Sequence, residues 1–195
     1  MVEQKVALLL GGGGEIGRFI AKELSDYRVV TSTRDRGLVK EDYILGDISS
    51  LESENIFIEC LERYQRLDLV INLVGGYASG GVNSYNEKDF DGLSQGMLKS
   101  CANATVGSYK YLGEGGVFMA ISSKSLGNVN WKGALYKGFK AASEEWVRNL
   151  NIALLDSKRN GAYIIRINDL KKDREELRAE VRKVVTRERE SNNDK

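Results

Sequence analysis

The sequence predicts an α/β protein with a doubly wound parallel sheet of about six strands. Short apolar or β-branched runs alternate with helical patterns from one end of the chain to the other. Continuous apolar strands joined by helices are typical of a parallel sheet that is covered on both faces. Four consecutive glycines separate the first strand from the first helix, at a turn that lies on the carboxyl edge of such a sheet.

Length and composition narrow the class of protein. The 195 residues are enough for one well-buried core and short for two, so we expect a single domain over 1–195. The chain is 42% hydrophobic and 29% charged, with no apolar run near the length of a membrane span. A formal net charge of +1 gives no general electrostatic footprint for nucleic acid. We therefore expect a globular protein with neither nucleic acid nor a membrane as partner.

The N-terminus and the cysteines favour a cytoplasmic location. The segment MVEQKVALLL has no basic region before its apolar run and no small-residue cleavage pattern after it, which favours a strand over a signal peptide. Cys60 and Cys101 stand alone without metal-ligand spacing, and the chain contains no histidine. We expect a reducing environment and no metal site.

Each strand and helix is predicted from the spacing of apolar residues. The expected strands are KVALLL at 5–10, RVVTS at 28–32, YILGD at 43–47, DLVINLV at 68–74, GVFMAIS at 116–122 and AYIIRI at 162–167. Helices are expected to begin near Ile16 and Leu51 and to cover about 90–112, 134–155 and 170–189, the last a charged helix within a C-terminal tail of 170–195.

The glycine-rich turn has the spacing of a dinucleotide site. Gly11, Gly14 and Gly17 form GxxGxxG between a strand and an amphipathic helix. One glycine permits the tight turn, one lets the backbone approach a phosphate, and one lets helix and strand pack closely. We expect cofactor contacts here and at Glu15 and Ile16, where the helix N-terminus offers unpaired N–H groups. The alternative is a flexible turn without a ligand.

The end of the second strand favours NADP over NAD. The run RVVTSTRDR presents Thr33 and Arg34 before its acidic residue, Asp35. A guanidinium suits a ribose 2′-phosphate through charge and fork geometry, whereas enzymes that use NAD usually carry an acidic residue here. Because Asp35 follows at once, NAD stays open, as does a solvated loop position for Arg34.

Two residues further along have the types that carbonyl reduction needs. Tyr136 and Lys140 lie four residues apart on an expected helix and therefore share one face. Reduction requires a hydride donor, a proton for the developing alkoxide and donors aimed at that oxygen. Tyr136 would be the acid, and a nearby Lys140 ammonium would lower its pKa. The plainer alternative makes Tyr136 a half-buried helix aromatic.

These motifs resemble those of the short-chain dehydrogenase/reductase family over roughly residues 4–168. That family combines a glycine-rich turn, an Asn-Asn-Ala-Gly segment after strand four, a serine ending strand five and Tyr-x-x-x-Lys thirteen residues on. This chain has GGGGEIG, NLVG at 72–75, Ser123, and Tyr136 with Lys140. The resemblance implies an NAD(P)-binding Rossmann fold with further cofactor contacts at Asp47, Ile48, Asn72, Val74, Gly75, Tyr136 and Lys140.

The resemblance also implies roles and a substrate class. The serine hydroxyl, at Ser123 or alternatively Ser122, would steady the substrate oxygen, and Lys140 would also bind the nicotinamide ribose. The expected function is hydride transfer to a small carbonyl or related substrate with a preference for NADP. The stretches VGGYASG and LGEGGVFMAIS look like the dihydropteridine reductase branch, so a dihydropteridine is a candidate substrate. That branch typically uses NADH and lacks a serine at the position of Ser123.

Two features depart from the family pattern. Met97 stands where an asparagine usually supports a proton relay through water. After AYIIRI the chain continues directly into helix, so the substrate region is truncated, without the usual covering segment and seventh strand. These departures leave a non-catalytic nucleotide-binding or scaffold protein as the alternative function.

Two apolar stripes suggest a homodimer or homotetramer. In the family, the helices corresponding to 90–112 and 134–155 commonly pair across a twofold axis. The first of these carries the stripe Leu93, Met97, Cys101, Ala104 and Ser108, which would either meet a partner or face its own sheet. A second apolar seam, at Leu170, Leu177, Val181 and Val184, is expected to dock on a neighbouring subunit.

Overall fold

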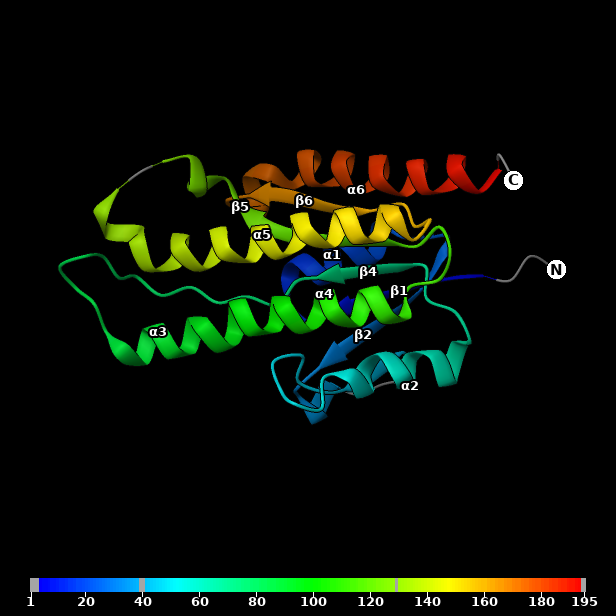
Figure 1. Cartoon of the computed structure of the whole chain (residues 1–195), viewed down its shortest axis with the longest axis horizontal. Helices are drawn as coiled ribbons and strands as arrows, with labels where there is room; N and C mark the ends of the chain where they lie inside the picture. Colours follow the sequence, from blue (N-terminus) through cyan, green and yellow to red (C-terminus); the bar gives the residue numbers. More distant parts are fainter. Residues whose placement is uncertain (1–3, 39–40, 129, 194–195) are drawn as a thin grey trace.

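Six parallel strands form one sheet in the order β3-β2-β1-β4-β5-β6 (Figure 1). The computed structural model describes residues 4–38, 41–128 and 130–193. This strand order is that of the doubly wound dinucleotide-binding fold, and it confirms the predicted fold class. The strands are β1 Lys5–Leu10, β2 Tyr27–Thr33, β3 Tyr43–Leu45, β4 Leu69–Asn72, β5 Val117–Ser123 and β6 Ala162–Ile167.

Helices cover both faces of the sheet (Figure 1). They are α1 Glu15–Glu23, α2 Glu54–Tyr64, α3 Glu87–Leu93, the π-helical segment η2 Ser94–Lys99, α4 Ser100–Tyr111, α5 Ala134–Asp156 and α6 Leu170–Asn193. One core cluster joins the sheet to α2, α4 and α5, and another joins it to α1 and α6. Within the described ranges, no helix is long and apolar enough to cross a membrane.

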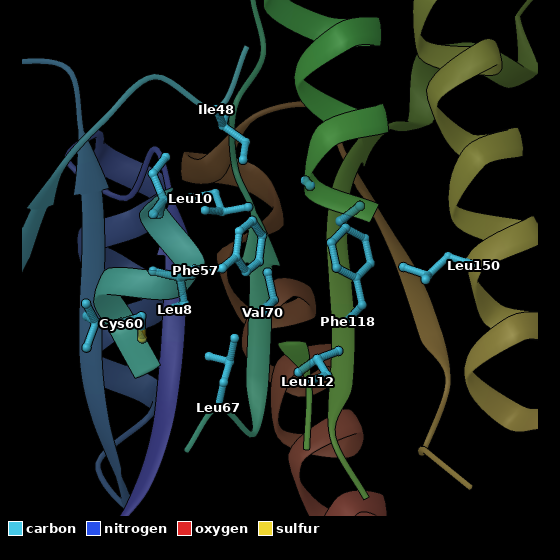
Figure 2. Close-up of a cluster of buried hydrophobic side chains, with 14 of the residues drawn as sticks. Leu8, Leu10, Ile48, Phe57, Cys60, Leu67, Val70, Leu112, Phe118 and Leu150 are labelled. Carbon is cyan, nitrogen blue, oxygen red and sulfur yellow. The ribbon is translucent and has the colours of Figure 1, made fainter. Parts of the chain in front are cut away.

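Successive residues of the central strands point to opposite faces of the sheet and so contribute to both core clusters. Leu8, Val70 and Phe118 point toward the α2, α4 and α5 side, where Figure 2 shows them around Phe57. Their strand neighbours, among them Leu9, point to the opposite face and pack against α1 and α6. Both faces are therefore apolar, which is why these strands appear in the sequence as continuous apolar runs.

A glycine sets how closely α2 approaches α4. A Cβ atom at Gly107 would lie 2.2 Å from Cε2 of Phe57, so the phenyl ring occupies the space that a larger residue would need. The same ring stacks on Tyr111 with centroids 5.8 Å apart. The lack of a side chain at Gly107 therefore lets the Phe57 ring of α2 pack directly against the backbone of α4.

The predicted helix at 90–112 is a succession of α3, η2 and α4. Gly96 lies in the π-helical segment, and the Ser100 hydroxyl donates to the Gly96 carbonyl at 2.9 Å and the Met97 carbonyl at 3.1 Å. A side-chain donor thus satisfies carbonyls where the regular helical ladder is interrupted.

Both apolar stripes assigned to subunit contacts are buried within this chain, so that assignment is wrong. The residues of the first stripe are at most 4% exposed. Leu93 and Met97 pack with Phe139 of α5, whereas Cys101 and Ala104 belong to the core cluster on the sheet and Ser108 is buried on α4. The residues of the second seam are at most 7% exposed and pack with α1 on the other face: Leu170, Leu177, Val181 and Val184. A helix stripe needs an apolar face to pack against, and the sheet and α5 provide it.

Two residues, Asn168 and Asp169, separate β6 from α6. Oδ2 of Asp173 accepts hydrogen bonds from both of their amides, at 2.6 Å and 3.0 Å, which fixes the first turn of α6. Lys124 Nζ bonds to the same carboxylate at 2.8 Å. The direct passage from strand to helix that the sequence predicts is therefore present.

Candidate active site

The glycines of the turn between β1 and α1 have separate steric roles. Gly11 has a φ of +73°, and a Cβ there would lie 2.7 Å from Cγ2 of Val74. A Cβ at Gly17 would lie 2.1 Å from the carbonyl oxygen of Gly12, so α1 packs directly on the turn. A Cβ at Gly14, the N-cap of α1, would meet no described atom within 4 Å. The open side of the turn is thus the side from which a phosphate can approach.

A groove runs along the carboxyl edge of the sheet over this turn. Its first part has a volume of about 350 Å³ and its second part about 470 Å³, and both are bordered by Gly11, Gly14 and Leu73. Eight expected cofactor contacts line the first part: Gly11, Gly14, Thr33, Arg34, Asp47, Ile48, Val74 and Gly75. Glu15, Ile16 and Gly17 line the second part together with Asn168 and Lys171.

Asn72 occupies a different position from the other expected contacts. Its Oδ1 accepts a hydrogen bond from the Val74 amide at 3.1 Å, and its side chain lines a small cavity beside Lys140. Asn72 is 5% exposed. Asn72 therefore holds the backbone of the segment after β4, and its side chain does not line the groove.

The end of β2 presents a cation to the groove. Arg34 is 77% exposed, and its Nη1 lies 3.7 Å from Oδ2 of Asp47. Burial of Asp47 opposes its ionisation, but hydrogen bonds from Ser49 and the charge of Arg34 outweigh burial, so the pKa of Asp47 lies below its usual value. The carboxylate of Asp35 accepts instead from the Gly37 amide at 2.8 Å, within its own turn.

Ser123 ends β5 near the Tyr136 side chain of α5. Burial raises the pKa of Tyr136, a hydrogen bond with Ser123 partly offsets this, and Tyr77 raises it further. The Ser123 oxygen also lies 2.8 Å from the Ser125 hydroxyl and accepts from the Ser125 amide at 3.2 Å. The strand end therefore fixes the serine next to the phenol on α5.

The pKa of Tyr136 lies above its ordinary value, whereas the sequence predicts that Lys140 lowers it. The Lys140 Nζ donates to the Ile121 carbonyl at 3.1 Å, and burial lowers the pKa of the lysine itself. Because burial dominates at both residues, Tyr136 remains a neutral phenol well into the alkaline range.

Ser122 and Ser123 point to opposite faces of β5, as neighbouring strand residues do. The Ser122 oxygen is buried beside Glu144, near enough to lower the pKa of that carboxyl, and it lines the small cavity next to Lys140. It is thus Ser123 that faces Tyr136.

Two residues near Tyr136 are absent from the sequence-based site. The Tyr77 ring contacts the Tyr136 ring at 5.3 Å with an interplanar angle of 60°, and Tyr77 is 78% exposed. Oδ1 of Asn168 lies 3.4 Å from the Ser123 oxygen. Both residues follow the carboxyl end of a strand, β4 or β6, and that placement was the available signal.

A glycine turn, a groove on the carboxyl edge and a serine beside a helical tyrosine define an α/β protein of the dinucleotide-binding class. A family model described as short chain dehydrogenase matches residues 5–171. The chain therefore belongs to the short-chain dehydrogenase family, whose members are NAD(P)-dependent oxidoreductases.

Individual relatives agree with this assignment. A short-chain dehydrogenase/reductase of Pestalotiopsis microspora is 28% identical over 169 residues, which cover 77% of this chain and 63% of the relative, so this chain spans less than two thirds of its length. A short-chain dehydrogenase/reductase from Serratia marcescens superposes with a TM-score of 0.78 at 20% identity, covering 94% of this chain and 89% of the other. A short chain dehydrogenase from Burkholderia cenocepacia in complex with NADP has a TM-score of 0.73 at 23% identity, covering 83% and 73%.

Proposed function

We propose that this protein is an NADP-preferring oxidoreductase that transfers a hydride to a small carbonyl or related substrate, with Ser123, Tyr136 and Lys140 as its site. The observation that carries the proposal is the placement of Ser123, at the end of β5, near Tyr136 of α5 at the carboxyl edge of the sheet. Their hydroxyls form a pair of donors that can be aimed at one substrate oxygen beside the groove.

The groove fits a dinucleotide by its shape and its donors. The open side of Gly14 leaves room for a phosphate at the N-terminus of α1, and Arg34 supplies a cation for a 2′-phosphate. The NADP-bound relative from Burkholderia cenocepacia supports this choice of cofactor. The bound nicotinamide would supply the hydride.

Tyr136 would give its proton to the developing alkoxide. A phenol whose pKa lies above its ordinary value is protonated at neutral pH, which is the form that an acid in the reductive direction requires. The hydrogen bond from Ser123 favours the phenolate and would ease transfer of the proton. Ser123 would also orient the substrate oxygen.

Lys140 would hold the cofactor beneath the reacting atoms. Its Nζ lies 3.6 Å from the position of a Cβ on Gly75, and Gly75 borders the groove. The bond from Nζ to the Ile121 carbonyl fixes the direction of the ammonium, which leaves further donors for ribose hydroxyls.

The test is turnover of NADPH with a panel of small carbonyls. Tyr136→Phe should abolish reduction while NADPH binding, followed by fluorescence, stays nearly intact, because the change removes one hydroxyl. Tyr43→Phe on β3, a part-buried tyrosine that does not line the groove, is the matched control and should reduce at the wild-type rate. Wild-type turnover by the Tyr136 variant would reject the mechanism, and NADPH binding without turnover of any substrate would favour a non-catalytic binding protein.

A dihydropteridine is the second candidate substrate. The exposed ring of Tyr77 stands beside Tyr136 and offers a face to a planar ring system. Reduction of a quinonoid dihydropteridine with a lower KM than that of any aliphatic carbonyl would support this class. A Tyr77→Ala variant should then raise the KM for the pterin more than that for an aliphatic carbonyl.

We also propose a homo-oligomer, in the cytoplasm, with its contacts on the outer surfaces of α4 and α5. These surfaces expose Val106, Tyr109, Trp146, Ile152 and Leu155, each by more than 40%. Light scattering at micromolar concentration should give a multiple of 21.7 kDa, and Trp146→Glu should shift it toward the monomer. A monodisperse wild-type monomer would reject the proposal.

A further inference from the structure

A small cavity lies beside Lys140, between β5 and α5. Its volume is about 20 Å³, which is enough for one water molecule. Its polar lining residues are Asn72, Ser122, Lys140, Ser143 and Glu144, and Met97 offers a thioether, a weak acceptor. The Ser143 hydroxyl is already bonded to the Phe139 carbonyl at 2.9 Å. The cavity thus joins the proposed active-site lysine to a serine and a carboxylate.

Ser122 is the polar side chain that this cavity leaves unsatisfied. The residue is 6% exposed, and within the described part of the chain its oxygen has no hydrogen-bond partner of ordinary geometry. A buried hydroxyl almost always has a protein or water partner. A water molecule in the cavity meets this requirement, because a hydroxyl can accept from water and donate its own proton elsewhere.

Glu144 is a buried carboxylate held in a fixed orientation. It is 3% exposed and lies one helical turn after Lys140, on the same face of α5. Arg166 of β6 binds both of its oxygens, at 2.8 Å and 2.6 Å, and Arg148 binds one of them at 2.8 Å. Both arginines are about half exposed, so they approach Glu144 from the surface while its carboxylate borders the cavity.

We propose that Glu144 is a positioning residue for Lys140, acting through the Ser122 hydroxyl and one buried water. The water accepts from the Lys140 ammonium and donates to both the Ser122 oxygen and the Glu144 carboxylate, which line the same cavity. The chain of hydrogen bonds therefore ends at a negative charge. A second donor of Lys140 remains on the Ile121 carbonyl. The inference rests on the proposed role of Lys140 in binding cofactor beside Tyr136.

The charges around Lys140 agree with this assignment. Burial lowers the pKa of Lys140, and Glu144 acts in the opposite direction. Cys101 faces the lysine from α4, but burial raises the pKa of its thiol to about 11, so it is neutral at neutral pH. Tyr136 on α5 is neutral as well, and Arg166 on β6 is bound to Glu144. Among these groups, Glu144 is thus the anion that opposes the effect of burial on Lys140.

The first measurement is the pKa of the Lys140 ammonium, followed by NMR of protein labelled with ¹³C-lysine. Glu144→Gln and Ser122→Ala should each lower it, since one removes the charge and the other breaks the chain of hydrogen bonds. Glu145→Gln is the matched control, because Glu145 is adjacent, binds the same Arg148 at 3.0 Å and is 65% exposed. An unchanged Lys140 pKa in both test variants, or an equal shift in the control, would overturn the proposal.

The second measurement is the pH profile of carbonyl reduction. In both test variants the alkaline loss of kcat should begin at lower pH, and kcat should fall on the order of tenfold, with substrate KM nearly unchanged. A merely structural network would lower stability without moving this profile. If Glu144→Gln fails to fold because two arginines lose their partner, Ser122→Ala alone decides. The NMR titration needs no turnover, so failure of the proposed function would be recognised separately.

A crystal structure at high resolution provides the third check. An ordered water within hydrogen-bond distance of the Ser122 oxygen and Lys140 Nζ is expected. A dry cavity would overturn the proposed chain of hydrogen bonds.

Discussion

Replacing Arg34 with alanine should change which cofactor this protein prefers. Arg34 is the cation at the end of β2 that borders the groove, and its side chain is 77% exposed. A ribose 2′-phosphate carries charge that NADH lacks, so the guanidinium distinguishes the two cofactors by charge-assisted hydrogen bonds. Removing it should weaken NADPH and leave NADH nearly unaffected.

The size of the effect follows from the surroundings of Arg34. Hydrogen bonds to a charged group contribute about 1.5–3 kcal/mol, but two features place Arg34 at the lower end of this range. Solvent screens an exposed guanidinium, and Asp47 already pairs with it at 3.7 Å in the free protein. A loss of about 1.5 kcal/mol corresponds to roughly a tenfold weaker affinity for NADPH.

Fluorescence titration of both reduced cofactors measures the change. Arg36→Ala is the matched control: Arg36 lies two positions further on, carries the same charge and is not among the residues that line the groove. The control should alter NADPH affinity by less than about twofold. Equal losses for NADPH and NADH in the Arg34 variant, or no loss for either, would refute the assignment of this residue to the 2′-phosphate.

Two further predictions concern stability. Gly107→Ala should lower the free energy of unfolding in urea by about 1–3 kcal/mol, because the new methyl group would strike the Phe57 ring, whereas Gly92→Ala, with open space around it, should not destabilise the protein. Asp173→Asn should destabilise the protein most above about pH 4, because the hydrogen bond from Lys124 and two backbone amides lower the folded pKa of Asp173 from 3.8 to about 2. That difference should disappear as the pH falls toward 2, and a difference that persists unchanged there would contradict this account.

Much of the sheet could be predicted because its strands are buried on both faces. KVALLL coincides with β1, a central strand in which five of six residues are buried, and AYIIRI coincides with the edge strand β6. The face that a helix buries was harder to predict. The stripe from Leu93 to Ser108 and the seam of α6 are apolar whatever covers them, and periodicity does not distinguish a neighbouring subunit from the chain's own sheet.

The residues of the candidate site stay a prediction, and their positions in the fold were easier to predict than their electrostatics. The spacing of Ser123, Tyr136 and Lys140 predicts a strand end and one helix face, and these residues lie at the end of β5 and on α5. The pKa of Tyr136 could not be predicted from spacing, because it depends on burial and on the direction of the Lys140 ammonium. No motif in the sequence links Tyr77 to Tyr136, so their ring contact could not be predicted from spacing.

The short junction between β6 and α6 marks a place where new chain could be inserted. Loop-closure entropy grows slowly, by about 0.6 kcal/mol for each doubling of length, so an insertion after Ile167 should cost little. It would have to precede Asn168, because the amides of Asn168 and Asp169 are held by Asp173 at the start of α6. Since Oδ1 of Asn168 lies 3.4 Å from the Ser123 oxygen, a segment grafted there would emerge beside the proposed catalytic residues. A designed loop that selects substrates could therefore be inserted at this junction without changing the core clusters on either face of the sheet.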